Sequence, residues 1–201
     1  MDARTLGFIL LGITIASTVF IEFKKRSTYA RFERMFANQD FEGCIELLDR
    51  SLTRAMYPEY NRLFMRLNAS MALGRIEEST STIDEMASLR MNKDQRLALY
   101  TKALAFFVEN GDKARALKML EGIESIGDEG LARASRESFE VFMEKTTKHI
   151  DRMERELQDA TGAERLRLYQ LLAIQYENKG DLKESERYLD LAREAIDSLG
   201  K

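Results

Sequence analysis

The residues best suited to chemistry are scarce in this chain. Its 201 residues include one histidine, His149, and one cysteine, Cys44. A structural zinc site normally takes four such ligands, so we expect no metal site. No nucleophile–base motif, phosphate-binding loop or dinucleotide fingerprint is present. We therefore expect no enzymatic activity and no cofactor.

The two candidate side chains have simple structural interpretations. His149 lies in a charge-rich stretch with no evident partner, so we expect a partly exposed surface histidine. Cys44 stands where a small residue is needed between helices, so we expect it to pack rather than react. A single thiol forms no disulfide within the chain, which fits a reducing compartment. A net charge of -3 gives no reason to expect nucleic acid as a partner.

The amino-terminal segment, residues 1–26, differs from the rest. Residues 6–23 read LGFILLGITIASTVFIEF, with Glu22 as the only charge. As a helix they span roughly 27 Å, close to the roughly 30 Å hydrocarbon core of a bilayer. We predict an uncleaved transmembrane anchor, because the near-neutral start MDAR and the lack of a small-residue cleavage site disfavour a signal peptide. A buried core helix is the other alternative.

Basic residues set the expected orientation of this anchor. Lys24, Lys25 and Arg26 follow the span at once, whereas only Arg4 precedes it. The positive-inside rule then places the amino terminus outside and the remainder in the cytoplasm. The same three residues are expected to contact anionic headgroups at the membrane surface. Because no Gly or Pro lies within residues 13–42, the anchor is expected to continue into the next helix without a break.

Residues 27–201 repeat one short pattern. Its turn positions are spaced 35, 37 and 69 residues apart, so one divergent copy fits in the last gap with its turn near residue 146. The turn residues are Gln39, Gly74, Gly111 and Gly180. A small residue follows five positions later in each copy, and a larger apolar residue four positions after that: Cys44, Ser79, Ala116, Ser185 and Leu48, Ile83, Leu120, Leu189. Such a period is typical of stacked supersecondary units.

These copies resemble the tetratricopeptide repeat, a helix–turn–helix unit of about 34 residues. The family's pattern is found in the last copy as Tyr169, Leu172, Ala173, Tyr176 and Gly180, and the second copy has the turn phrase LGRIEES. The fourth copy departs from the pattern, since it lacks the small and glycine positions. The resemblance implies an all-α fold, an α-solenoid of about five helical hairpins, at about residues 27–54, 58–89, 93–125, 128–160 and 163–199.

The resemblance also implies where a partner would bind. In this family the first helix of each pair lines a concave face, which suits an extended or helical peptide. The corresponding positions here are Tyr29, Glu33, Phe64, Met65, Asn68, Met71, Thr101, Lys102, Ala105 and Val108. The alternative is that they are ordinary packing residues. The Lys/Asn clamp of some family members is not reproduced, because Tyr29 and Glu33 occupy its first positions, so we do not expect chaperone-tail binding.

The last predicted helix is expected to close the array. One stripe of it is mostly apolar and the opposite face is charged, as a terminal unit requires. The stripe comprises Leu182, Ser185, Tyr188, Leu189, Ala192, Ala195, Ile196 and Leu199.

The sequence therefore predicts a single-pass membrane protein that acts as a scaffold for a protein or peptide partner on the cytoplasmic face. Two alternatives share its layout. One is an exported-side accessory factor for protein translocation or envelope assembly, with reversed topology. The other is an organellar protein-import receptor. Nothing in the sequence indicates homo-oligomers.

Overall fold

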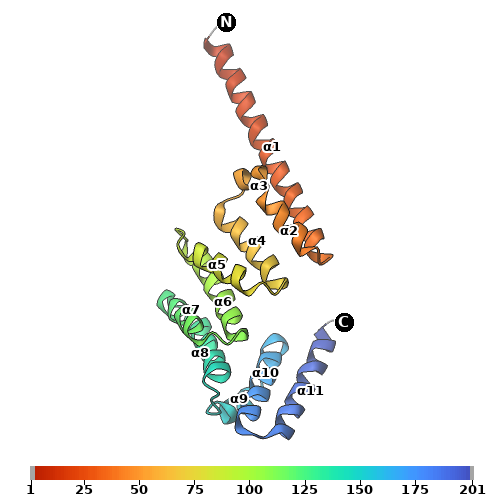
Figure 1. Cartoon of the computed structure of the whole chain (residues 1–201), viewed down its shortest axis with the longest axis vertical. Coiled ribbons are helices and arrows are strands. Elements are labelled where there is room, and N and C mark those ends of the chain that lie inside the picture. Colours follow the sequence, from red (N-terminus) through yellow and green to blue (C-terminus); the bar gives the residue numbers. More distant parts are fainter. Residues whose placement is uncertain (1–2, 200–201) are drawn as a thin grey trace. The chain divides into compact units, whose positions relative to one another are not determined.

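The chain is built from helices alone over the residues that the structure describes (Figure 1). The structure is a computed structural model, which describes the backbone of residues 3–199 and the side chains of residues 18–197. The all-α prediction is confirmed within these limits. The helices are α1 (Ala3–Ala37), α2 (Phe41–Asp49), α3 (Ser51–Met56), α4 (Glu59–Ala72), α5 (Ile76–Ala87), α6 (Lys93–Glu109), α7 (Lys113–Ile126), α8 (Glu129–Met143), α9 (Ile150–Glu156), α10 (Gly162–Lys179) and α11 (Leu182–Leu199).

Two compact units divide the chain within α6. The first, unit 1, extends to Leu99, and the second, unit 2, begins at Tyr100. The sequence predicted one continuous repeat domain over residues 27–201, so this division was not expected.

Helix α1 is one unbroken helix of 35 residues, as the lack of Gly and Pro predicted (Figure 1). Among the residues whose placement is described, no helix is long and apolar enough to cross a membrane. The predicted span, residues 6–23, falls mostly on residues 6–17, whose side chains lie outside those that the structure describes.

The core of unit 1 joins the carboxyl-terminal half of α1 to α2 and α4. Phe32 of α1 is buried with Cys44, Leu48 and Met65, and Met35 packs beside them. The N-cap of α2 is secured by its own side chain, since the Asp40 carboxylate accepts a hydrogen bond from the backbone N–H at position 43. The later part of α1 is therefore a member of the folded unit and not a free stem.

A hydrogen bond also ties α3 to α1. Tyr57 directly follows α3, and its hydroxyl donates to the backbone carbonyl of Lys25 at 2.5 Å. Burial raises the pKa of this phenol, so it stays a neutral donor over the physiological range.

The predicted turn residues all adopt the left-handed backbone conformation. The φ angles are 61° at Gln39, 67° at Gly74, 71° at Gly111 and 84° at Gly180. Lys145 has a φ of 52°, next to the position near 146 where the divergent copy was expected to turn. Glycine adopts the left-handed conformation without strain because it has no Cβ, whereas Gln39 and Lys145 adopt it although their Cβ atoms make it unfavourable.

The small residues predicted between helices are buried. Cys44, Ser79 and Ala116 are fully buried, and Ser185 is nearly so. The hydroxyl of Ser79 donates to that of Ser70 at 3.0 Å, which satisfies a polar group inside the contact of α4 with α5.

The core of unit 2 has α10 at its centre. Leu168 and Leu172 of α10 are fully buried, together with Val141 of α8 and Met153 of α9. Tyr188 of α11 packs on the same cluster. Helix α10 thus contacts three other helices of its unit.

The apolar stripe predicted for α11 packs only in part. Ser185, Tyr188 and Ala192 are buried, whereas Leu182 and Ile196 are 69% and 51% exposed. Leu189, expected to fill the space between hairpins, is also exposed. The stripe is wider than the face that α10 covers, which corrects the prediction.

Candidate functional site

The predicted groove residues on α1 are open to solvent. Tyr29 and Glu33 are exposed and lie one turn apart on the same helix face. The charge of Glu33 raises the pKa of the Tyr29 phenol.

The predicted groove residues on α4 differ among themselves. Phe64, Asn68 and Met71 are half-buried, whereas Met65 is only 8% exposed and belongs to the core of unit 1. The Phe64 ring stacks on that of Tyr60, with centroids 5.7 Å apart. Met65 therefore serves packing, and the other three remain accessible in part.

The predicted residues on α6 lie in unit 2. Thr101, Lys102 and Val108 are half-buried and Ala105 is exposed. The structure therefore places the predicted groove residues in two separate units, and describes each set within its own unit.

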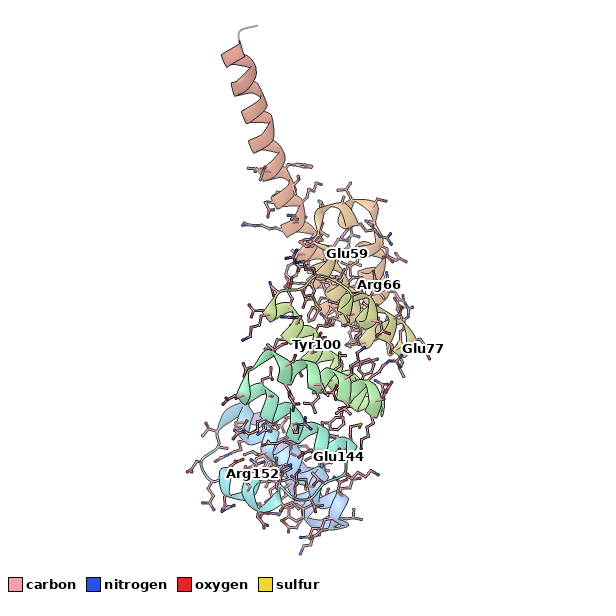
Figure 2. The ribbon with its side chains drawn as sticks, turned by 90° about the vertical axis from the view of Figure 1, so that its left-hand side faces the viewer. Glu59, Arg66, Glu77, Tyr100, Glu144 and Arg152 are labelled. Atoms are coloured by element: carbon pink, nitrogen blue, oxygen red, sulfur yellow. The ribbon has the colours of Figure 1, made fainter. Side chains whose placement is uncertain are left out.

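The described part of unit 2 contains a cavity of about 440 Å³, here called the charged cavity, beside α8 and α9. Most of its lining residues carry a formal charge or can acquire one. They are Glu124, Ala132, Arg133, Arg136, Glu137, Glu140, Lys148, His149 and Arg152. Arg152 is labelled in Figure 2.

Helix α8 supplies most of the lining because of its sequence spacing. Arg133, Arg136, Glu137 and Glu140 recur at intervals of three or four residues, so they share one face of the helix. The N-cap Asp128 fixes the start of α8 by accepting a hydrogen bond from the Leu131 backbone N–H at 3.0 Å.

The connection from α8 to α9 brings the remaining residues to the cavity. After the left-handed turn at Lys145, the His149 backbone N–H donates to the side-chain carbonyl of Gln175 at 3.0 Å. The Asn178 amide donates to the carbonyl of Val141 at 2.9 Å. The first bond anchors the connection on α10 and the second ties the end of α8 to α10, so Lys148, His149 and the start of α9 are held in place.

Glu137 is the most deeply placed carboxylate, with a side chain that is 7% exposed. Arg152 donates to one of its oxygens at 2.9 Å, and Arg167 of α10 lies 3.4 Å from the other. A buried carboxylate needs such partners, because removing one leaves an uncompensated charge. Glu137 therefore links α8, α9 and α10.

Glu140 is held by two partners from the connection. The Lys148 ammonium lies 2.9 Å from its Oε2, and Nε2 of His149 lies 2.7 Å from the same atom. Burial acts to raise the pKa of Glu140, but the hydrogen bonds from Lys148 and His149 outweigh it and lower the pKa.

His149 corrects the sequence prediction. It was expected as a surface histidine without a partner, but its side chain is 14% exposed, contacts Glu140, and lies 3.4 Å from a guanidinium nitrogen of Arg152. The connection that carries His149 departs from the repeat pattern. The repeat spacing therefore did not indicate which residues His149 would contact. The charges of α8 at three- and four-residue intervals were visible in the sequence and could have marked the cavity.

The charged cavity presents groups of both charges that can bind polar ligands. Three arginines and one lysine face three glutamates, and Arg133 is 74% exposed with a 4.0 Å ion pair to Glu137. No hydroxyl or thiol nucleophile lines it. In the described residues no group of His, Cys, Asp and Glu could hold a metal ion. The rim cations Arg133 and Lys148 remain open to an anionic group of a ligand.

A second charged cluster links helices in unit 1. One amino group of Arg66 donates to both oxygens of Asp49, at 2.7 and 2.9 Å, and the other donates to Glu78 at 2.7 Å (Arg66 is labelled in Figure 2). Arg75 bonds both Glu78 and Glu42. These pairs join α2, α4 and α5, so we infer that they stabilise the packing of these helices.

The predicted membrane-surface residues have different partners. Lys25 pairs with Glu22 at 2.9 Å, and the Lys24 ammonium lies 5.5 Å from the ring centre of Phe20. Arg26 is exposed.

Comparison with known proteins adds no relative: no family model, curated protein or solved structure matches this chain.

Proposed function

We propose that the chain is a membrane-anchored adaptor, whose tetratricopeptide-like hairpins bind a protein partner at the cytoplasmic membrane surface. The observation that supports this most is the division of α1. Its later part packs into unit 1 through Phe32, whereas Val19, Phe20 and Phe23 remain exposed just before Lys24. A run of exposed apolar residues that ends at basic residues is typical of the membrane boundary of an anchor.

The hairpin architecture supports the comparison with tetratricopeptide repeats. Helices that follow one another pack as pairs, such as α4 with α5 and α10 with α11. The turns of these pairs use left-handed residues at Gly74 and Gly180. Such units often serve as binding surfaces for other proteins.

For the partner we propose an acidic segment that reaches the rim of the charged cavity. Arg133 and Lys148 are mostly exposed and can each form a further charge-assisted hydrogen bond. The half-buried residues of α4 and α6 are further candidate contacts, each within its own unit. No enzymatic role is part of this proposal.

Crosslinking in native membranes tests the partner proposal. We expect Arg133→Glu to reduce capture of the partner about tenfold, because it replaces an attractive charge by a repulsive one. Arg193→Glu on α11, whose arginine is equally exposed, is the matched control and should leave capture unchanged. Phe64→Ala and Lys102→Ala test the predicted groove positions separately. If none of these variants changes capture of the partner, neither the charged cavity nor the predicted groove is the binding surface.

Thiol labelling tests the orientation. Cys44 is fully buried, so it is a poor site for this assay and can stay in place. A cysteine introduced by Asn38→Cys, in the exposed turn before α2, should react with an impermeant reagent only after the membrane is opened. Labelling from outside intact cells would favour the reversed topology.

A further inference from the structure

A small basic cleft lies between α1, α2 and α3 in unit 1, and is here called the basic cleft. Its volume is about 240 Å³, and its charged lining residues are Lys24, Arg31 and Arg50. Ser27 and Thr28 of α1 add hydroxyl groups. No carboxylate lines it.

The nearby carboxylates are engaged elsewhere. Glu22 pairs with Lys25 at 2.9 Å, and Asp49 pairs with Arg66 at 2.7 Å. Within the described residues none of the three cleft cations forms an ion pair with a carboxylate, unlike the arginines of the charged cavity. The basic cleft therefore presents concentrated positive charge without internal compensation.

The position of the basic cleft on α1 points to its ligand. Lys24, Ser27, Thr28 and Arg31 share one helix face, directly after the exposed apolar residues that end at Phe23. Arg31 lies about 12 Å along the axis from Phe23. Side chains of a helix tilt toward its amino terminus, so those of Lys24 and Arg31 lean toward the proposed membrane. The headgroup layer of a bilayer is about 5–8 Å thick, which these long side chains can reach.

The rim of the basic cleft is apolar on the α3 side. Leu52 is 63% exposed, and Met56 lines the cleft beside it. Helix α3 contacts α1, and the Tyr57 hydroxyl bond to the Lys25 carbonyl fixes it there. The cleft thus has cationic side chains next to the apolar side chains of Leu52 and Met56.

We propose that the basic cleft binds the phosphate of an anionic phospholipid in the leaflet that faces the hairpin units; this inference rests on the proposed membrane anchor. Arginine forks match phosphate oxygens in a bidentate manner, and a lysine adds a point charge. The Leu52 side chain lies against the upper part of an acyl chain. A zwitterionic lipid is disfavoured, since its ammonium group would enter a site that is already cationic.

Lipid-specific quenching tests this proposal on the full chain. The protein has no tryptophan, so Leu52→Trp at an exposed position gives a single indole reporter. The protein is reconstituted in phosphatidylcholine vesicles that contain a small fraction of either brominated phosphatidylglycerol or brominated phosphatidylcholine. We expect phosphatidylglycerol to quench much more strongly at equal mole fraction.

Two charge-matched pairs of substitutions separate the basic cleft from general attraction. Arg31→Gln with Arg50→Gln should lower the preference for phosphatidylglycerol by about fivefold or more per arginine. Arg34→Gln with Arg54→Gln removes the same charge from exposed positions of unit 1 outside the cleft, and should preserve most of the preference for phosphatidylglycerol. Equal losses in the two pairs, or equal quenching by both lipids, would overturn the proposal.

Two further arms distinguish the remaining outcomes. If inorganic phosphate at constant ionic strength abolishes the preference, the cleft is a site for soluble phosphate and the lipid proposal is wrong. If alkaline carbonate extracts the protein from the vesicles, the proposed anchor fails and the lipid site fails with it. Retention in the membrane with equal quenching by both lipids would overturn the lipid site alone.

Discussion

Backbone conformation at single turn residues has a measurable effect on stability. Gln39 and Lys145 adopt positive φ angles, although each carries a Cβ. A residue other than glycine in this region costs about 1 kcal/mol or more. The left-handed turns at these two residues therefore lower the free energy of unfolding.

Substitution at the turns should show this directly. We expect Gln39→Gly to raise the melting temperature and Gly180→Ala to lower it, each by an amount that corresponds to about 1 kcal/mol. A Cβ at Gly180 would meet no atom within 4 Å, so its effect is one of backbone conformation alone. Circular dichroism during heating provides the measurement. Asn38→Gly, next to the strained residue, is the control and should not stabilise.

Cys44 is expected to be chemically silent in the folded protein. Its side chain is fully buried, and burial, with a smaller effect from Asp40, raises the pKa of the thiol. A disulfide reagent at pH 8 should modify it slowly in the native state and rapidly in denaturant. Fast stoichiometric reaction of the native protein would contradict the packing described here. The Asn38→Cys variant provides the reactive comparison.

At the scale of elements, one carboxylate joins the last three helices. The hydroxyls of Tyr176 on α10 and Tyr188 on α11 both donate to the same oxygen of Glu154 on α9, at 2.7 and 2.9 Å. Both tyrosines are buried, so a lost acceptor leaves two hydroxyls without a partner. We expect Glu154→Ala to cost about 1–3 kcal/mol and Glu154→Gln less, as measured by chemical denaturation.

The same contact predicts sensitivity to high pH. Burial and the Glu154 charge raise the pKa of Tyr188 to about 12, and burial raises that of Tyr176 as well. A group whose folded pKa exceeds its unfolded value contributes stability that is complete below pH 10 and is lost as the pH rises to about 12. Phenolate absorbance should therefore develop together with unfolding of unit 2. Independent titration of these tyrosines in a folded protein would contradict this.

For Glu140 we expect the opposite dependence, a loss of stability in acid. Its folded pKa lies below the ordinary value of 4.5, so the stability it adds is present above that pH and is lost as the pH falls through the folded value. Glu140→Gln should therefore destabilise the protein at neutral pH and match the wild type at low pH. Glu144→Gln, an exposed carboxylate 3.8 Å from Lys113, is the control and should have little effect at either pH (Glu144 is labelled in Figure 2).

Sequence reasoning succeeded where a feature depends on neighbouring residues. The turn at Gly111 and the packing of Ser79 follow from conformational freedom and side-chain size, which a short segment specifies. The charged cavity depends on pairs distant in sequence, such as Glu137 with Arg167. The exposure of Leu182 depends on how much of α11 its neighbour covers. The spacing of charges on α8 marks one side of the cavity, but no local pattern specifies the distant pairs or the exposure of Leu182.

At the scale of the whole molecule, the anchor remains the prediction on which the proposed function depends. A charged residue at the centre of a membrane helix costs about 2.5–3.5 kcal/mol. We expect Ile13→Lys with Ile15→Lys to release the protein from membranes into alkaline carbonate. Ile76→Lys and Leu182→Lys, at exposed positions of other helices, should leave it bound. Release of the wild type under the same conditions would exclude the anchor.

The packing of α1 also determines how the hairpin units could be shed from a membrane. A proteolytic cut between Phe23 and Lys24 would leave Phe32, Met35 and the Tyr57 bond in place, so the released fragment would keep the core of unit 1. A cut a few residues later, within the turn that carries the Tyr57 bond, would remove that bond and loosen α3. The position of the cut, within a few residues of one helix, therefore decides whether the fragment keeps the contact between α1 and α3.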